Sequence, residues 1–356
     1  MRRQILVPLD GSPAAETAVW HAAALVGPLA DGLLLLQVLE PPLLPSESVS
    51  RDLDWRLLRA ESVAYLRSVA DRLAETGVEA TAAVETGAAA EQIVRHARRD
   101  HIALVVMAAH GRGEADTFAF GGTTHKVLSL APASVMVVRR GADAGPPARA
   151  VGYRHLLVPL DGSPAGEWAL GLATAVARHQ QATLLLLHLV PDAPPAWERL
   201  PASGEEAELA RRLTELRAER ATRYLSEMEA RLAHTALRVR SRIGRAAQVA
   251  EGIRAVAAEE GVDLIALAAH GTSGAPFPSG SVAQRLLATS GLPIVVFQDA
   301  PSGETGSGRR AADATLPFPD ASAGADRDTD DDHDDDHDPD HAGGGPGAAA
   351  DDLADR

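Results

Sequence analysis

Short apolar runs alternate with longer amphipathic stretches along the first three hundred residues. In the first half of this region, the apolar runs are Ile5–Leu9, Leu33–Leu39, Val78–Val84, Ile102–Ala109 and Val135–Val138. Largely continuous apolar residues are typical of strands covered on both faces, as in parallel sheets. The stretches between them are rich in helix-forming residues and include Ala14–Leu29, Leu53–Glu75 and Ala89–Arg99.

The second half repeats this alternation. Its apolar runs are Leu156–Leu160, Leu184–Val190, Leu237–Arg240, Leu264–Ala269 and Ile294–Phe297. A long amphipathic stretch, Glu205–Ala233, separates the second run from the third. Strands that alternate with helices predict the α/β class. We expect two tandem doubly wound domains, each with a five-stranded parallel sheet.

An internal repeat supports this division. The nine residues LVPLDGSPA occur at Leu6–Ala14 and again at Leu157–Ala165, an offset of 151. The letters AAHG end at Gly111 in the first copy and at Gly271 in the second, an offset of 160. The chain therefore holds two copies of one domain, and each copy is long enough to form its own core.

Composition places the domain boundaries. We assign residues 1–140 to the first domain, 141–152 to a linker with two prolines, 153–299 to the second domain and 300–356 to a tail. Residues 301–356 hold sixteen acidic residues and four arginines, in a chain whose net charge is -15. This composition predicts a disordered, solubilising tail. Weak binding of divalent metals by His333, His337 and His341 is the alternative.

Residue types exclude several classes of chemistry. The 356-residue chain has no cysteine, which removes disulfides, thiolate metal sites and cysteine nucleophiles. Its one lysine, Lys126, is not in a P-loop, and the serine-hydrolase elbow and the HExxH motif do not occur. We therefore expect no dedicated enzyme. Residues before the tail are nearly neutral overall and no apolar stretch could span a bilayer, so we expect a cytoplasmic protein that binds neither nucleic acid nor membrane.

Both repeated motifs lie where an open parallel sheet binds ligands. Asp10 follows the first apolar run and Gly111 follows the fourth, while Asp161 and Gly271 hold the same places in the second copy. The carboxyl ends of parallel strands meet at one rim of a sheet. A glycine-rich turn that leads into a helix presents amide groups suited to phosphate. We therefore expect a ligand cleft in each copy.

These motifs and their order resemble the universal stress protein family, whose domain is of the adenine-nucleotide α-hydrolase-like type. The family pattern opens on V-x-x-D and continues with G-x-x-G, about nine residues and G-[S/T]. The resemblance implies a stress-response protein that binds ATP, with Mg²⁺ nearby, and in which Asp10 and Asp161 contact the nucleoside. It also implies that glycine-loop residues surround the phosphates: Gly111, Gly121, Gly122 and Thr123 in the first copy, and Gly271, Gly280 and Ser281 in the second.

The loops also depart from the family pattern. The first glycine of the loop is Ala108 in one copy and Ala268 in the other, so a methyl group occupies a place of close approach. The alternative function is a nucleotide-independent protein-interaction module of the same fold. An enzyme of the wider superfamily is a third class, which the scarcity of lysine disfavours. Asp10 and Asp161 could equally be helix-entry residues, because Asp-Gly-Ser-Pro before a helix is strong capping chemistry.

The last apolar run of each copy, Val135–Val138 or Ile294–Phe297, is expected at the edge of its sheet. An uncovered apolar edge strand invites pairing. The family resemblance implies a dimer contact at this strand, so we expect the two copies to pair within one chain as a pseudo-dimer. The same strands could join two chains into a homodimer, or the linker could cover the edge instead.

Overall fold

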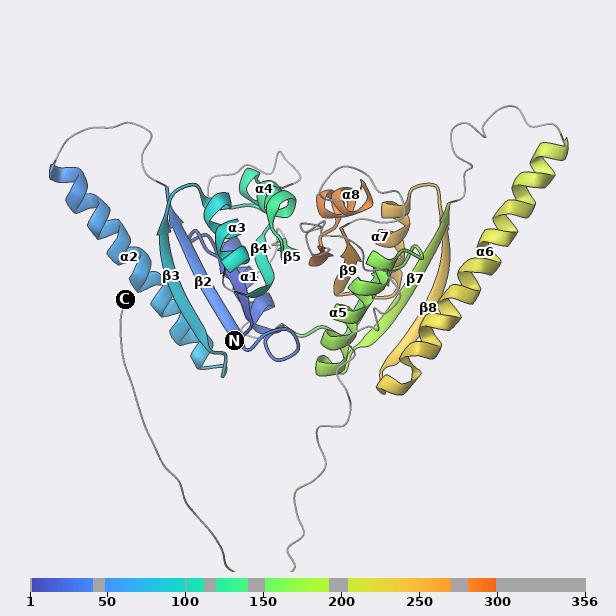
Figure 1. The fold of residues 1–356 in the computed structure, drawn as a ribbon, viewed down its shortest axis with the longest axis horizontal. Helices are drawn as coiled ribbons and strands as arrows, with labels where there is room; N and C mark the ends of the chain where they lie inside the picture. The colour runs from blue at the N-terminus through green and yellow to red at the C-terminus, as the bar shows by residue number, and fades with distance from the viewer. Residues whose placement is uncertain are drawn as a thin grey trace, which may run out of the picture. The chain divides into compact units, whose positions relative to one another are not determined.

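The computed structural model describes residues 2–40, 49–99, 101–111, 120–139, 151–191, 204–269 and 281–298. The first half contains β1 (Gln4–Pro8), α1 (Pro13–Ala23), β2 (Gly32–Leu39), α2 (Val49–Ala74), β3 (Ala80–Thr86), α3 (Ala89–Arg99), β4 (Ile102–Ala108), α4 (Gly122–Leu130) and β5 (Ser134–Val138). The second contains β6 (His155–Pro159), α5 (Pro164–Gln180), β7 (Thr183–Pro191), α6 (Gly204–Leu232), a 3-10 turn (Ala233–Thr235), β8 (Arg238–Ala246), α7 (Val249–Glu259), β9 (Leu264–Ala268), α8 (Ser281–Thr289) and β10 (Ile294–Phe297). The predicted alternation of strands and helices is therefore confirmed in both halves (Figure 1).

All ten strands belong to one mixed sheet, in the order β3-β2-β1-β4-β5-β10-β9-β6-β7-β8. Within each half the paired strands are parallel, as predicted. The halves meet where β5 pairs antiparallel with β10, with Val137 opposite Ile294 and Met136 opposite Val295. The last strand of each half therefore lies at the centre of the whole sheet, and β3 and β8 form its outer edges.

Helices cover both faces of this sheet (Figure 1). Buried residues of α1, α2, α5 and α6 form one core layer with strand residues of both halves. Buried residues of α3, α4, α7 and α8 form a second layer, which also includes strands of both halves. Each core layer extends through both halves because the sheet is continuous across β5 and β10.

Equivalent hydrogen bonds to the opposite half are made by the residues that follow β5 and β10. Arg139, directly after β5, donates from Nη2 to the Leu287 carbonyl in α8 at 2.6 Å. Gln298, directly after β10, donates from Nε2 to the Leu128 carbonyl in α4 at 2.8 Å. The side chain that follows the last strand of each half thus donates a hydrogen bond to a backbone carbonyl in the last helix of the other half.

One helix is shorter than its sequence predicts. α1 ends at Ala23 rather than at Leu29. Gly27 follows with a φ of 96°, a left-handed conformation, and Pro28 cannot continue a helix. None of the described helices is long and apolar enough to cross a membrane. The predicted acidic tail and residues 141–150, most of the predicted linker, lie outside the described residues.

Candidate functional site

The turn after β1 forms one side of the first candidate site. Gly11 has a φ of 78°, which glycine adopts at low cost. The Ser12 amide donates to Oδ1 of Asp10 at 2.9 Å, and Ser12 Oγ accepts from the Ala15 amide at 3.2 Å. Ser12 is therefore the N-cap of α1, with Pro13 in the first turn. One oxygen of Asp10 serves helix entry, as the alternative interpretation predicts.

The second copy builds the same turn. Gly162 has a φ of 81°. The Ser163 amide donates to Oδ1 of Asp161 at 3.0 Å, and Ser163 Oγ accepts from the Gly166 amide at 3.1 Å. The repeated letters thus produce two matching helix starts.

Replacing Ser163 by alanine should lower the free energy of unfolding by about 1 kcal/mol, because the Gly166 amide would lose its acceptor at a buried helix start. Urea unfolding followed by circular dichroism measures this loss. The exposed Ser226 of α6 is the control, and its replacement by alanine should change stability by less than about 0.5 kcal/mol. An equal loss in both variants would contradict the capping role.

Asp10 and Gly111 lie next to each other at one rim of the sheet. A Cβ on Gly111 would stand 2.7 Å from Oδ2 of Asp10, which is closer than van der Waals contact. Oδ2 is not the oxygen that holds the Ser12 turn. The two residues meet because β1 and β4 are neighbouring parallel strands that end at the same rim. Glycine at position 111 leaves room for this carboxylate.

A cleft of about 290 Å³ opens between this pair and the starts of α3 and α4. Three of the predicted residues line it, namely Asp10, Gly111 and Thr123. Ile93 and Met107 also line it and belong to the core layer beneath α3 and α4. The cleft therefore lies on that face of the sheet. Its volume is near the lower end of the usual range for small-ligand pockets.

Gly121 and Gly122 form the start of α4 beside this cleft. Gly121 is the N-cap, and no side chain caps the helix in the described part of the chain. The Gly121 amide donates to the Ala109 carbonyl at 2.8 Å, and Thr124 Oγ1 donates to the Ala108 carbonyl at 3.0 Å. These bonds fix the helix start against the end of β4. The positive end of the helix dipole is thereby placed near the cleft, where it favours an anion.

Sequence reasoning misses Glu40, which also lines the cleft. Its Oε1 accepts from the Ala89 amide at the start of α3 at 3.1 Å. The sequence feature that identifies Glu40 as a candidate is its position directly after β2. The carboxyl end of β2 lies beside that of β1. His110 lines the same cleft. The cleft thus contains two carboxylates and an imidazole besides Gly111.

The second predicted site is described only in part. Gly271 and Gly280 lie outside the described residues, and Ser281 is the exposed first residue of α8. Asp161 borders a different cavity, formed with α6. Within the described ranges, no group of three or more His, Asp or Glu side chains could hold a metal ion by itself.

Known proteins share both the sequence pattern and the fold. The profile of the universal stress protein family matches residues 1–139 and 152–298. Universal stress protein YxiE of Bacillus subtilis is 25% identical over 148 residues, which are 39% of this chain and 100% of that protein.

Solved structures are similar over both halves of the chain. A universal stress protein from Archaeoglobus fulgidus superposes with a TM-score of 0.60 at 18% identity, covering 83% of this chain and 98% of that one. A functionally unknown protein from Pseudomonas aeruginosa superposes with a TM-score of 0.54 at 16% identity, covering 83% and 92%. At these identities the likeness concerns the fold alone.

Proposed function

Because the chain belongs to the universal stress protein family, we propose that its first half binds an adenine nucleotide such as ATP in the cleft at Asp10. One observation carries this proposal: Asp10 Oδ2 and Gly111 meet at a cleft of about 290 Å³ beside the start of α4. A carboxylate suits the hydroxyl groups of a ribose, and a helix start suits phosphate. Nucleotide binding would then be the signal to which this stress protein responds.

Each group in the cleft has a distinct part in this proposal. Asp10 accepts from the nucleoside through Oδ2 while Oδ1 keeps its bond to the Ser12 amide. The phosphates lie toward the amides at the start of α4 and the side chain of Thr123. Mg²⁺ prefers oxygen ligands and usually binds through substrate phosphates, so the Thr123 hydroxyl and the Glu40 carboxylate are the further donors that this cleft offers.

We propose binding without dedicated catalysis. The titratable side chains that line the cleft are Asp10, Glu40 and His110. Both carboxylates already accept backbone hydrogen bonds, Asp10 from Ser12 and Glu40 from Ala89. Each carboxylate thus holds a backbone amide at a turn or helix start. We propose that neither acts as a general base on a water next to the phosphates.

Gly111→Val should abolish ATP retention, because the branched side chain would collide with the Asp10 carboxylate. Asp10→Asn keeps an acceptor for the turn but removes the charge, and it should weaken binding at least about tenfold, equivalent to about 1.4 kcal/mol. Equilibrium dialysis with labelled ATP and Mg²⁺ measures both effects. Asp161→Asn makes the same change in the turn of the second half and should leave binding in the first half unchanged.

Wild-type protein that retains no ATP at millimolar nucleotide would refute the nucleotide proposal. Binding that survives Gly111→Val but is lost in Asp161→Asn would refute the assignment to the first half. Circular dichroism of each variant checks that a loss of binding is not a loss of fold.

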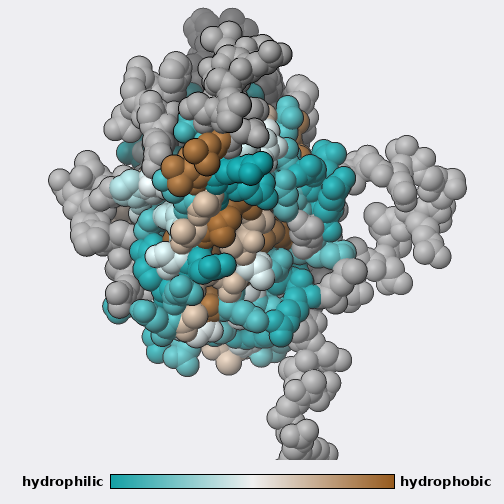
Figure 2. All heavy atoms as spheres, turned by 90° about the vertical axis from the view of Figure 1, so that its left-hand side faces the viewer, coloured by the Kyte–Doolittle hydropathy of each residue, from teal (hydrophilic) through white to brown (hydrophobic). Residues whose placement is uncertain are grey.

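A nucleotide-independent interaction module is the second candidate function. Ala108 lines the cleft where the family pattern has glycine. On α2, the side chains of Leu53 and Leu57 are 70% and 58% exposed. Apolar areas interrupt the largely hydrophilic side of the molecule that carries α2 (Figure 2). The dialysis experiment separates the two candidates, since only the first predicts retained nucleotide.

A further inference from the structure

A second cavity lies in the second half, on the face of the sheet opposite to the cleft at Asp10. It encloses about 320 Å³ between the Asp161–Gly162 turn, the end of β7 and the middle of α6. Leu187 of β7 belongs to the core layer beneath α7 and α8. The next residue, His188, therefore points to the other face, where its ring lies edge-on to Tyr224 of α6 with centroids 6.3 Å apart. The two cavities are thus separate sites.

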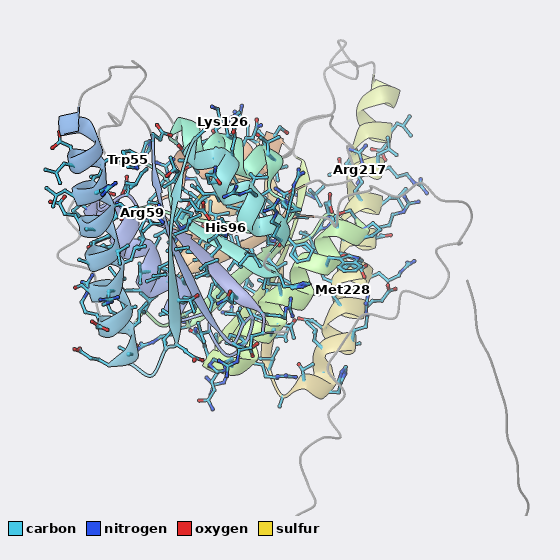
Figure 3. The ribbon with its side chains drawn as sticks, turned by 60° about the vertical axis from the view of Figure 1, so that its left-hand side comes forward. Trp55, Arg59, His96, Lys126, Arg217 and Met228 are labelled. Carbon is cyan, nitrogen blue, oxygen red and sulfur yellow. The ribbon has the colours of Figure 1, made fainter. Side chains whose placement is uncertain are left out.

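Two arginines of α6, Arg217 and Arg220, line this cavity one helical turn apart. Figure 3 shows Arg217 on α6, nearer the start of the helix than Met228. Within the described residues neither arginine forms a hydrogen bond or an ion pair, whereas Arg231 of the same helix pairs with Glu167 at 2.8 Å. Two neighbouring guanidinium groups present many donors in a geometry that matches carboxylate and phosphate oxygens.

The cavity wall also contains buried polar atoms. Tyr224 Oη and His188 Nδ1 have no hydrogen-bond partner among the described residues. Burial, with the charges of Glu167 and Asp161, raises the pKa of Tyr224 to about 12, so its hydroxyl remains a donor at neutral pH. Burial lowers the pKa of His188 despite a backbone hydrogen bond at Leu160 and the nearby charge of Asp161, so its ring is neutral at neutral pH. Buried polar atoms are normally paired, and these two therefore favour a bound polar group.

The first half provides an internal comparison. Tyr65-Leu66 of α2 aligns with Tyr224-Leu225 of α6 at an offset of 159, so the two arginine positions correspond to Leu58 and Glu61. The hydroxyl of Tyr65 is likewise buried, and it lies beside Glu16. The buried phenol is thus common to both halves, and the arginine pair distinguishes the second. Any binding that depends on these cations should belong to the second half.

We propose that this cavity binds a small organic anion. Its carboxylate or phosphate oxygens accept from the guanidinium groups of Arg217 and Arg220, and its apolar body lies against Val190, Ala221 and the ring of Tyr224. The cavity volume of about 320 Å³ is about ten times the volume that one water molecule occupies in liquid water. The cavity is therefore large enough for a ring with a charged substituent. The site is independent of the nucleotide cleft and of its proposed occupant.

Titration calorimetry of the full chain with 4-bromobenzoate, phenyl phosphate and neutral benzamide tests this proposal. At least one anion should bind, and benzamide should bind at least about tenfold more weakly. The anion that binds more tightly identifies the preferred oxyanion. In crystals grown with 4-bromobenzoate, a bromine anomalous peak should lie between α6 and the end of β7.

The double variant Arg217→Leu/Arg220→Glu introduces the residues of the first half at two exposed helix positions. It should lower anion affinity at least about tenfold while its circular dichroism spectrum stays unchanged. Arg223→Gln is the matched control, because Arg223 is an exposed arginine of the same helix outside the cavity lining. It should bind the anions like the wild type.

The proposal is overturned if neither anion binds at concentrations up to about 10 mM, because a cavity with a weaker affinity would be almost empty at lower anion concentrations. It is also overturned if benzamide binds as tightly as the anions, or if the double variant binds them like the wild type. Asp10→Asn, which tests the nucleotide cleft, should leave this binding unchanged. Failure of one proposal is therefore distinguishable from failure of the other.

Discussion

Replacing Val295 by aspartate is expected to lower the free energy of unfolding by at least about 4 kcal/mol, because a buried side chain is lost and a charge enters an apolar core. Val295 of β10 is 1% exposed, and Met136, its partner in β5, is 0% exposed. On its other side β10 pairs with β9, so the strand is enclosed within the sheet. The carboxylate would have neither water nor an exposed edge to reach.

The lower stability of the variant should affect both halves, because each core layer includes residues from both. Single-tryptophan variants that keep either Trp20 of α1 or Trp168 of α5 report on the two halves separately during urea unfolding. Trp168 lies near the junction, with its ring centroid 6.4 Å from that of Phe297. We expect the midpoints from both reporters to fall together.

The control is Val63→Asp on α2, where the wild-type side chain is 40% exposed. It should change stability by no more than about 0.5 kcal/mol. If Val295→Asp shifted the Trp168 midpoint and left the Trp20 midpoint unchanged, the halves would be independently stable and the continuous core would have no energetic consequence.

The sheet is the part of the structure that the apolar runs predict best. β10 has the predicted bounds, Ile294–Phe297, and β4 ends one residue earlier than predicted, at Ala108. β3 is displaced by two residues, with Ala80–Thr86 observed and Val78–Val84 predicted. β8 differs most, because the sequence predicts Leu237–Arg240 and the strand extends over Arg238–Ala246. As an edge strand β8 is partly exposed, and its alternating arginines do not form the continuous apolar run that identifies a buried strand.

The candidate site could be predicted only as far as the strand ends determine it. Asp10 and Gly111 come together because β1 and β4 are neighbours, which follows from the fold class. The contribution of Glu40 depends on how α3 begins beside β2. The cavity at Arg217 depends on where α6 crosses the end of β7. Helix placement of this kind is set by side-chain packing between distant segments, which neither a repeat nor a periodicity specifies.

Acidification is expected to weaken the folded state through His21 of α1. Its Nδ1 lies 2.7 Å from the hydroxyl of Tyr153, which belongs to the segment before β6 and is 2% exposed. The Tyr153 amide donates to Gln180 of α5 at 2.5 Å, and the Gln180 side chain donates to the Ala24 carbonyl at 2.7 Å. The histidine therefore lies in a hydrogen-bonded contact between the two halves.

Burial lowers the pKa of His21 from its ordinary value of 6.5 to about 4. Between these two values the unfolded chain binds a proton that the folded chain excludes. The stability contributed by the neutral ring is therefore complete above about pH 6.5, falls as the pH drops, and is lost below about pH 4. At about 1.36 kcal/mol for each unit of pKa difference, the loss between pH 7 and pH 5 is about 2 kcal/mol.

Because many carboxylates titrate in the same range, the informative quantity is the stability difference between the wild type and His21→Gln. Glutamine offers Tyr153 a polar partner but does not take up a proton. In urea unfolding the advantage of the wild type should shrink by about 2 kcal/mol from pH 7 to pH 5. Tyr153→Phe removes the hydroxyl and keeps His21 buried, so its pH dependence should remain that of the wild type. A difference that stays constant with pH would show that the folded protein accommodates the protonated ring, and the buried contact could not then act as an acid-sensitive link between the halves.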